Sequence, residues 1–198
     1  LTQLKTNKMK EFKIRCSAIG KIMTNPRSKT ETLSKTTKTY LEEWSKEQIY
    51  NRKKEVFSKY IDKGNAVEVE SLAYISKELD IPSLVKNEES FENGFLTGTP
   101  DAILDEYIRD VKNSWDCFSF PLYFNSVPNK DYYWQAQGYM ALTDIDRYKL
   151  IYTLMDTPEE LIQREYFGDE STDLVEFARK YKYSNIDSRY RIKVCNNF

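Results

Sequence analysis

Apolar residues recur along this chain with two different spacings, and the spacing predicts where helices and strands lie. Residues 38–63 and 65–79 carry apolar side chains three or four positions apart, which is typical of amphipathic helices, and Gly64 is expected to separate the two. Residues 147–156, "RYKLIYTLMD", are typical of a buried strand. Shorter helices are expected over 16–24, 131–143, 158–165 and 171–182, and further strands over 84–91, 95–104, 107–113 and 189–194.

This order of helices and strands predicts an α/β fold with a mixed central β-sheet flanked by helices. A length of 198 residues is typical of a single domain that can bury a sizeable core. Within that domain we distinguish a basic N-terminal segment over 1–40, a core over about 64–155 and a helical tail over 156–198.

Charge is distributed unevenly along the chain. Residues 1–40 hold ten Lys or Arg and two Asp or Glu, whereas acidic residues outnumber basic ones in the remainder. A basic segment on an acidic body indicates a surface that binds a polyanion beside a pocket that attracts cations. A solvated N-terminus without a partner is the alternative reading.

The absence of histidine excludes several kinds of site. No Ser-His-Asp or Cys-His triad and no His-ligated zinc site can be built from this chain. The three cysteines, Cys16, Cys117 and Cys195, form no CxxC pair and are expected to be free thiols in a reducing cytoplasm. No secretory signal and no membrane-spanning apolar run is recognisable, so no membrane partner is expected.

Two aspartates face each other in a predicted hairpin. If the Asp105–Glu106 pair is the turn, Asp101 lies opposite Asp110, and Lys112 shares the strand face of Asp110. Facing carboxylates destabilise a sheet unless a cation lies between them, and oxygen ligands suit Mg²⁺ or Mn²⁺. The backbone carbonyl of Val111 is a further candidate ligand. A surface hairpin with an ordinary Asp–Lys ion pair is the alternative.

Two helices add candidate residues. Glu68 lies on one stripe with Leu72 and Ile75, where a carboxylate is costly unless it is paired or binds metal, so it is the third candidate ligand. Gln135 and Tyr139, four positions apart, share a face of the helix over 131–143. Gln135 is a candidate to hydrogen-bond a water or a ligand carboxylate, although ordinary packing explains both residues equally well.

Together these stretches resemble the motifs of the PD-(D/E)XK nuclease superfamily. "TPDAIL" is similar to its PD element and "RDVKNS" to its (D/E)XK element, while "GNAVE" and "QAQGY" resemble the flanking G-x-x-x-E and Q-x-x-x-Y helices. The order of the motifs and the segment "IRCSAIGKIMTNPRS" resemble the YqaJ-type viral recombinases, the group that contains phage lambda exonuclease. The resemblance spans about residues 12–155 and implies a restriction-endonuclease-like core.

This resemblance implies a Mg²⁺-dependent 5′→3′ exonuclease that acts on the ends of double-stranded DNA, with Mn²⁺ as a substitute metal. It also implies phage recombination in a bacterial cytoplasm, a single-strand annealing protein as partner, and a toroidal homo-oligomer, trimeric or tetrameric. The implied metal ligands are Glu68, Asp101, Asp110 and the Val111 carbonyl, with Lys112 and Gln135 as catalytic residues. Ser17, expected near a helix N-cap, and Arg15 are implied to contact a terminal phosphate.

Two other functions fit the same residues. A structure-selective or site-specific endonuclease of this fold would use identical chemistry but would not need a DNA end. A catalytically inactive DNA-binding module would keep the fold without the full set of catalytic residues. It is disfavoured because that set is intact: Glu68, Asp101, Asp110, Lys112 and Gln135.

Overall fold

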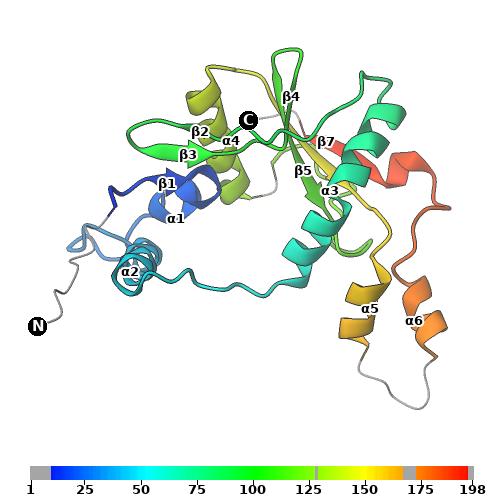
Figure 1. The fold of residues 1–198 in the computed structure, drawn as a ribbon, viewed down its shortest axis with the longest axis horizontal. Coiled ribbons are helices and arrows are strands. Elements are labelled where there is room, and N and C mark those ends of the chain that lie inside the picture. Colours follow the sequence, from blue (N-terminus) through cyan, green and yellow to red (C-terminus); the bar gives the residue numbers. More distant parts are fainter. Residues whose placement is uncertain (1–9, 128, 167–172, 196–198) are drawn as a thin grey trace, which may run out of the picture.

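The computed structural model describes residues 10–127, 129–166 and 173–195 (Figure 1). Residues 1–9 of the basic segment, and residues 167–172 and 196–198 of the tail, lie outside the described residues. The helices are α1 (Ile19–Ile22), α2 (Lys35–Tyr50), α3 (Lys59–Glu78), α4 (Lys130–Thr143), α5 (Glu159–Glu165) and α6 (Leu174–Arg179), with 3₁₀ turns at Cys16–Ala18 and Ser188–Tyr190. The strands are β1 (Ile14–Arg15), β2 (Phe91–Glu92), β3 (Leu96–Gly98), β4 (Ala102–Leu104), β5 (Tyr107–Asn113), β6 (Tyr148–Thr153) and β7 (Ile192–Cys195).

The strands form two mixed sheets, which confirms the α/β class. In the larger sheet, of order β4-β5-β6-β7, β5 and β6 run parallel, and β4 and β7 run antiparallel to their neighbours. In the smaller sheet, of order β1-β3-β2, β1 is parallel to β3. No helix in the described ranges combines the length and apolarity needed to cross a bilayer.

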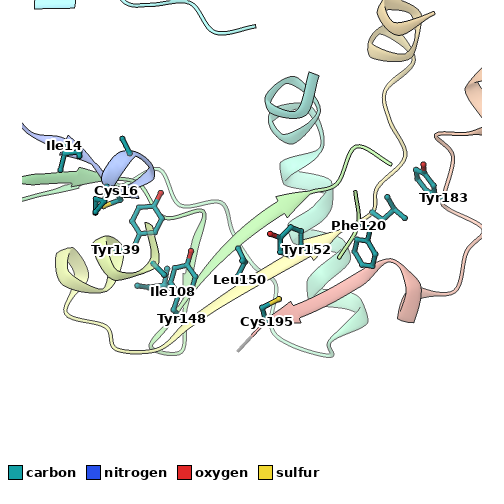
Figure 2. Close-up of a cluster of buried hydrophobic side chains, with 14 residues drawn as sticks. Ile14, Cys16, Ile108, Phe120, Tyr139, Tyr148, Leu150, Tyr152, Tyr183 and Cys195 are labelled. Atoms are coloured by element: carbon teal, nitrogen blue, oxygen red, sulfur yellow. The ribbon is translucent and has the colours of Figure 1, made fainter. Parts of the chain in front are cut away.

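Helices α3 and α4 cover opposite faces of the larger sheet. Leu72 and Ile75 of α3 pack against Val111 of β5. On the other face Ala136 and Tyr139 of α4 pack against a core that includes Ile108, Leu150 and Tyr152 (Figure 2). Because side chains alternate along a strand, Asp110 and Lys112 lie on the same face as Ile108, toward α4.

The predicted hairpin is confirmed in both its turn and its register. Leu104 pairs with Tyr107 and Ala102 with Arg109, which leaves Asp105 and Glu106 as the two-residue turn. Both turn residues have positive φ, at 51° and 59°, which is the conformation that a type I′ turn requires.

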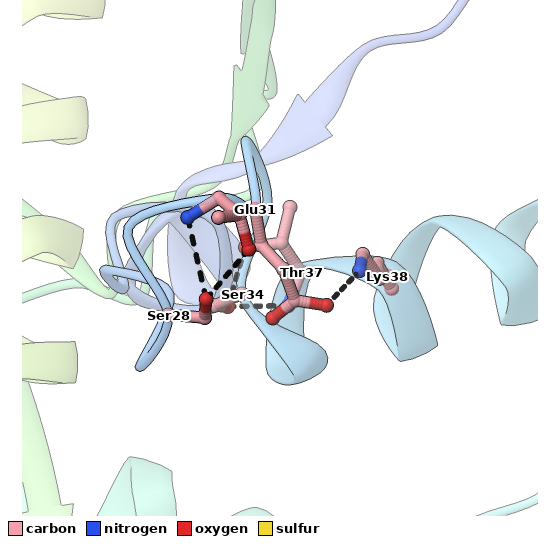
Figure 3. Close-up of polar contacts among 6 residues, drawn as sticks. Ser28, Glu31, Ser34, Thr37 and Lys38 are labelled. Carbon is pink, nitrogen blue, oxygen red and sulfur yellow. Dashed lines mark hydrogen bonds and ion pairs between the residues drawn. The ribbon is translucent and has the colours of Figure 1, made fainter.

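The single helix predicted over 38–63 is wrong. Helix α2 begins earlier, because the Ser34 hydroxyl accepts a 3.0 Å hydrogen bond from the Thr37 amide and so caps the helix, and Lys38 pairs with Glu31 at 2.7 Å (Figure 3). It ends at Asn51, whose left-handed φ of 49° stops the helical hydrogen bonds. An extended segment over 51–58 leads to α3, which continues through Gly64 without a break.

Two of the predicted strands also differ. The segment 84–90 forms no strand, and only Phe91–Glu92 pairs with β3. The strand predicted over 95–104 is divided between the two sheets, because Pro100 lies between β3 and β4 and lacks an amide hydrogen for the ladder.

Gly98 lies where the smaller sheet approaches α4, and its replacement by alanine should destabilise the fold. A Cβ atom there would lie 2.7 Å from Cε1 of Tyr139 and 2.8 Å from the sulfur of Cys16, so both would have to move. We expect Gly98→Ala to lower the free energy of unfolding by about 1–3 kcal/mol in urea titrations. Gly94→Ala is the matched control, since a Cβ there meets nothing within 4 Å and should leave stability nearly unchanged.

Candidate active site

A cavity of about 610 Å³ opens between α3, the end of β5 and the start of α4. Six of the eight residues singled out from the sequence line it: Ser17, Glu68, Asp101, Val111, Lys112 and Gln135. Asp110 lies beneath its surface, fully buried, and Arg15 is exposed outside the lining. The structure therefore brings the predicted residues, apart from Arg15, together from the 3₁₀ turn Cys16–Ala18, α3, the hairpin and α4.

Asp110 and Lys112 form the buried centre of this site. The Lys112 ammonium lies 2.5 Å from Oδ2 of Asp110, whose side chain is fully buried. The Gln135 amide donates a long 3.4 Å hydrogen bond to Oδ1 of the same carboxylate. Burial by itself would lower the pKa of Lys112, but the charges of Asp110 and Asp101 outweigh it and hold that pKa above its usual range. Lys112 is therefore protonated at neutral pH.

Asp101 lies directly before β4, where Pro100 interrupts the chain's extended course. Its Oδ2 accepts a 2.7 Å hydrogen bond from the Val111 amide of β5, which holds the carboxylate at the cavity wall. Burial and the charge of Asp110 raise the pKa of Asp101 to about 8, although Lys112 and the Val111 amide act in the opposite direction. Burial and the neighbouring carboxylate thus disfavour the charged form of Asp101 when no cation is bound.

Glu68 reaches the cavity from α3 and is held by an ion pair. Its Oε2 lies 2.5 Å from the ammonium of Lys86, in the segment that precedes β2. No group of three or more Asp, Glu, His or Cys side chains within the described ranges is arranged to hold a metal ion. The three-carboxylate set of Glu68, Asp101 and Asp110 therefore stays a prediction.

The donor chemistry nevertheless fits a hard divalent cation. Asp101 and Asp110 supply carboxylate oxygens, and the charge of Asp110 is, after burial, the second cause of the raised pKa of Asp101. A divalent cation between the two would relieve that repulsion. Mg²⁺ and Mn²⁺ bind through one or two carboxylates and carbonyl oxygens and keep the rest of their shell as water. Glu68 would have to leave Lys86 to join them.

A hydrogen-bonded chain fixes the face of α4 that lines the cavity. Nε2 of Gln135 lies 3.1 Å from the Tyr139 hydroxyl, which in turn donates to the Thr99 carbonyl at 3.1 Å. The predicted sharing of one face by Gln135 and Tyr139 is thus confirmed. Sequence reasoning missed Tyr132, whose ring centre lies 5.2 Å from the Lys112 ammonium. Its position three residues before Gln135 places it on the same face of α4 and was the available signal.

Ser17 is exposed in the cavity, but it does not cap a helix. It lies within the 3₁₀ turn Cys16–Ala18, and the N-cap of α1 is Ala18, which makes no side-chain cap hydrogen bond. Ser17 thus lies next to the N-cap, as predicted, but is not the capping residue itself. Its free position in the wall leaves the hydroxyl available for a ligand, and contact with a terminal phosphate stays a prediction.

Lys63, which precedes Gly64 in α3, is a buried cation that the sequence did not reveal. Its ammonium donates to the Met155 carbonyl at 2.7 Å and to the carbonyl of Trp115, a cavity residue, at 3.0 Å. It therefore ties α3 to the segments that follow β5 and β6. Burial lowers the pKa of Lys63 to about 8.

This buried cation predicts a pH-dependent contribution to stability. The folded state loses the Lys63 proton at about pH 8, whereas the ordinary value of 10.5 applies on unfolding. The unfolded state binds more protons between these values, so stability rises with pH across this window. Relative to Lys63→Met, the wild-type free energy of unfolding should increase by roughly 3 kcal/mol as the pH rises through it. Exposed Lys53→Met is the control and should show no such difference in denaturant titrations at each pH.

Solved structures that are similar to this chain include exonucleases. Neither the protein-family models nor the curated protein sequences gave a match. Among solved structures, a phage-related exonuclease from Haemophilus somnus 129PT superposes with a TM-score of 0.77 and 28% sequence identity, over 97% of this chain and 87% of that chain. The resemblance to the lambda-exonuclease-like family of PD-(D/E)XK nucleases is confirmed. The predicted restriction-endonuclease-like fold is confirmed with it.

The lambda-exonuclease-like fold is also shared with more distant structures. The alkaline exonuclease LHK-Exo from Laribacter hongkongensis superposes with a TM-score of 0.54 and 16% identity, over 75% of this chain and 73% of that chain. The same enzyme in complex with dAMP gives a TM-score of 0.56. Because the phage-related exonuclease covers nearly the whole chain, the likeness includes most of the tail, which carries none of the family motifs.

Proposed function

We propose that the protein is a metal-dependent deoxyribonuclease that digests double-stranded DNA from an end, in the 5′→3′ direction. The observation that carries the proposal is the buried Asp110–Lys112 pair beside Asp101, at the floor of a cavity in a lambda-exonuclease-like fold. Negative charge builds up in the transition state when a phosphodiester is hydrolysed. These residues supply an ammonium group and carboxylates that can bind a cation, and both would stabilise that charge.

Asp101, Asp110 and the Val111 carbonyl would hold Mg²⁺, with Glu68 as a further ligand. The bound ion would offset negative charge on the phosphate and lower the pKa of a water bound to it. Lys112, whose pKa its two carboxylate neighbours raise, can donate a hydrogen bond to a phosphate oxygen or orient the attacking water. Gln135, already hydrogen-bonded to Asp110 and Tyr139, is placed to orient that carboxylate or a water.

The need for an end distinguishes this proposal from an endonuclease of the same fold. With Mg²⁺, linear duplex DNA carrying a 5′ label should release the label first as a mononucleotide, and EDTA should abolish release. Sealed circular duplex of the same sequence should resist digestion. Cleavage of the circle at a rate similar to the linear form would support the endonuclease, and DNA binding without cleavage of either would support the inactive module.

Two partners follow from the family resemblance alone. A toroidal homo-oligomer of three or four chains would increase the length of DNA processed in one binding event, and a single-strand annealing protein would be the partner in phage recombination. Light scattering coupled to size-exclusion chromatography measures the oligomer directly. A monomer at all concentrations would remove the toroid from the proposal and leave the active site unaffected.

A further inference from the structure

The loop that follows β5 carries aromatic residues that lie in opposite environments. Trp115 and Phe120 are buried, and Phe120 lies in the core near Tyr183 (Figure 2). Phe118, between these two anchors, is 94% exposed. The loop therefore holds an aromatic ring in solvent while its neighbours on both sides are fixed in the interior.

The backbone around Phe118 is fixed by its own hydrogen bonds. The amide of Ser119 donates to the Asp116 carboxylate at 2.8 Å, and the Ser119 hydroxyl donates to the Asp116 carbonyl at 2.9 Å. The amide of Cys117 donates to the Tyr183 hydroxyl at 3.3 Å. These hydrogen bonds hold the backbone on both sides of Phe118 in one conformation.

The turn lies at the edge of the candidate active site. Ser114, Trp115 and Ser119 all line the cavity, and Phe118, which directly precedes Ser119, is adjacent to the lining without being part of it. Within the described part of the chain, Phe118 makes no contact with another aromatic ring or with a cation. A single exposed apolar residue is ordinary on a protein surface, but one held by a rigid turn beside a catalytic cavity is placed to meet a ligand.

We propose that Phe118 stacks on a nucleobase of the DNA strand that enters the cavity. This inference rests on the proposed function, which supplies the DNA. Lys112 and the proposed cation at the cavity floor suit a phosphate group. The base of the same nucleotide has an apolar face, which an aromatic ring can cover. Aromatic stacking accepts any base, which suits an enzyme that must process every sequence.

Affinity for DNA tests the stacking directly. In Ca²⁺, which is expected to permit binding without cleavage, fluorescence anisotropy on a labelled linear duplex should show Phe118→Ala binding roughly five- to one-hundredfold more weakly than wild type. Phe118→Trp should bind as tightly as wild type, and Phe118→Leu as weakly as the alanine variant. Phe95→Ala is the matched control, because Phe95 is 79% exposed but lies between β2 and β3, outside the cavity lining.

A duplex with abasic nucleotides at the 5′ end separates stacking from other causes. On that DNA, wild type and Phe118→Ala should bind equally, because the base that Phe118 contacts is missing. Equal binding of both proteins to normal DNA, or the same loss on abasic DNA, would overturn the inference while leaving the proposed function intact. Failure of the wild type to bind or digest any DNA would instead overturn the proposed function, and this inference with it.

Discussion

Asp110→Asn should lower the rate of DNA hydrolysis by roughly 10³-fold or more at saturating DNA and Mg²⁺. The substitution keeps the size of the side chain and removes its charge. Asp110 is fully buried against the Lys112 ammonium, so the change removes a candidate metal ligand and leaves the lysine with Asp101 alone. The measurement is the initial rate of nucleotide release from a labelled linear duplex.

The control for this variant lies in the same hairpin. Asp105→Asn changes an exposed turn residue with positive φ, a conformation that asparagine tolerates, and should retain wild-type activity. Thermal unfolding of both variants shows whether the fold persists. Activity of folded Asp110→Asn within tenfold of wild type would exclude Asp110 from the catalytic centre.

Lys112→Met should also abolish most of the activity, by roughly 10²- to 10³-fold, while leaving DNA affinity in Ca²⁺ close to that of wild type. Its ammonium has a raised pKa beside two carboxylates and lies near the Tyr132 ring, and its proposed part is to offset charge that develops on the phosphate. That charge is greatest in the transition state, and the loss should therefore fall on the rate rather than on binding.

Lys149→Met on β6 is the comparison for Lys112→Met. Lys149 is a half-buried lysine that lies 4.7 Å from the Tyr107 ring centre and outside the cavity lining. Its substitution should leave both rate and affinity near wild type. Equal losses of affinity and rate in Lys112→Met would indicate that Lys112 serves general DNA binding instead of catalysis.

Local patterns predicted the elements whose signals are contained in a few neighbouring residues. The hairpin register followed from the two-residue turn, and β5 over Tyr107–Asn113 and α4 over Lys130–Thr143 lie as expected. The sequence did not predict the boundary between α2 and α3. Asn51, the left-handed C-cap, is a weak stop signal, and the apolar spacing continues past it. Gly64 does not break the helix, because the free-energy cost of one glycine inside a helix is smaller than the stabilisation that α3 gains from packing on the sheet.

The sequence predicted those parts of the candidate site in which residue spacing places two side chains on one face of a helix or strand. Asp110 and Lys112 are two apart on a strand, and Gln135 and Tyr139 are four apart on a helix, so their sharing of a face needs no tertiary information. The pairing of Glu68 with Lys86, and the contacts of Lys63 with carbonyls after β5 and β6, join segments far apart in the chain. No local pattern encodes such contacts, and only the fold reveals them.

The central claim is that Asp101 and Asp110 hold a catalytic cation beside Lys112. A crystal soaked in MnCl₂ and measured at the manganese absorption edge locates that ion by its anomalous signal. We expect a peak about 2 Å from oxygen atoms of Asp101, Asp110 and the Val111 carbonyl. An active protein whose bound manganese lies elsewhere, with both aspartates free of metal, would contradict the claim.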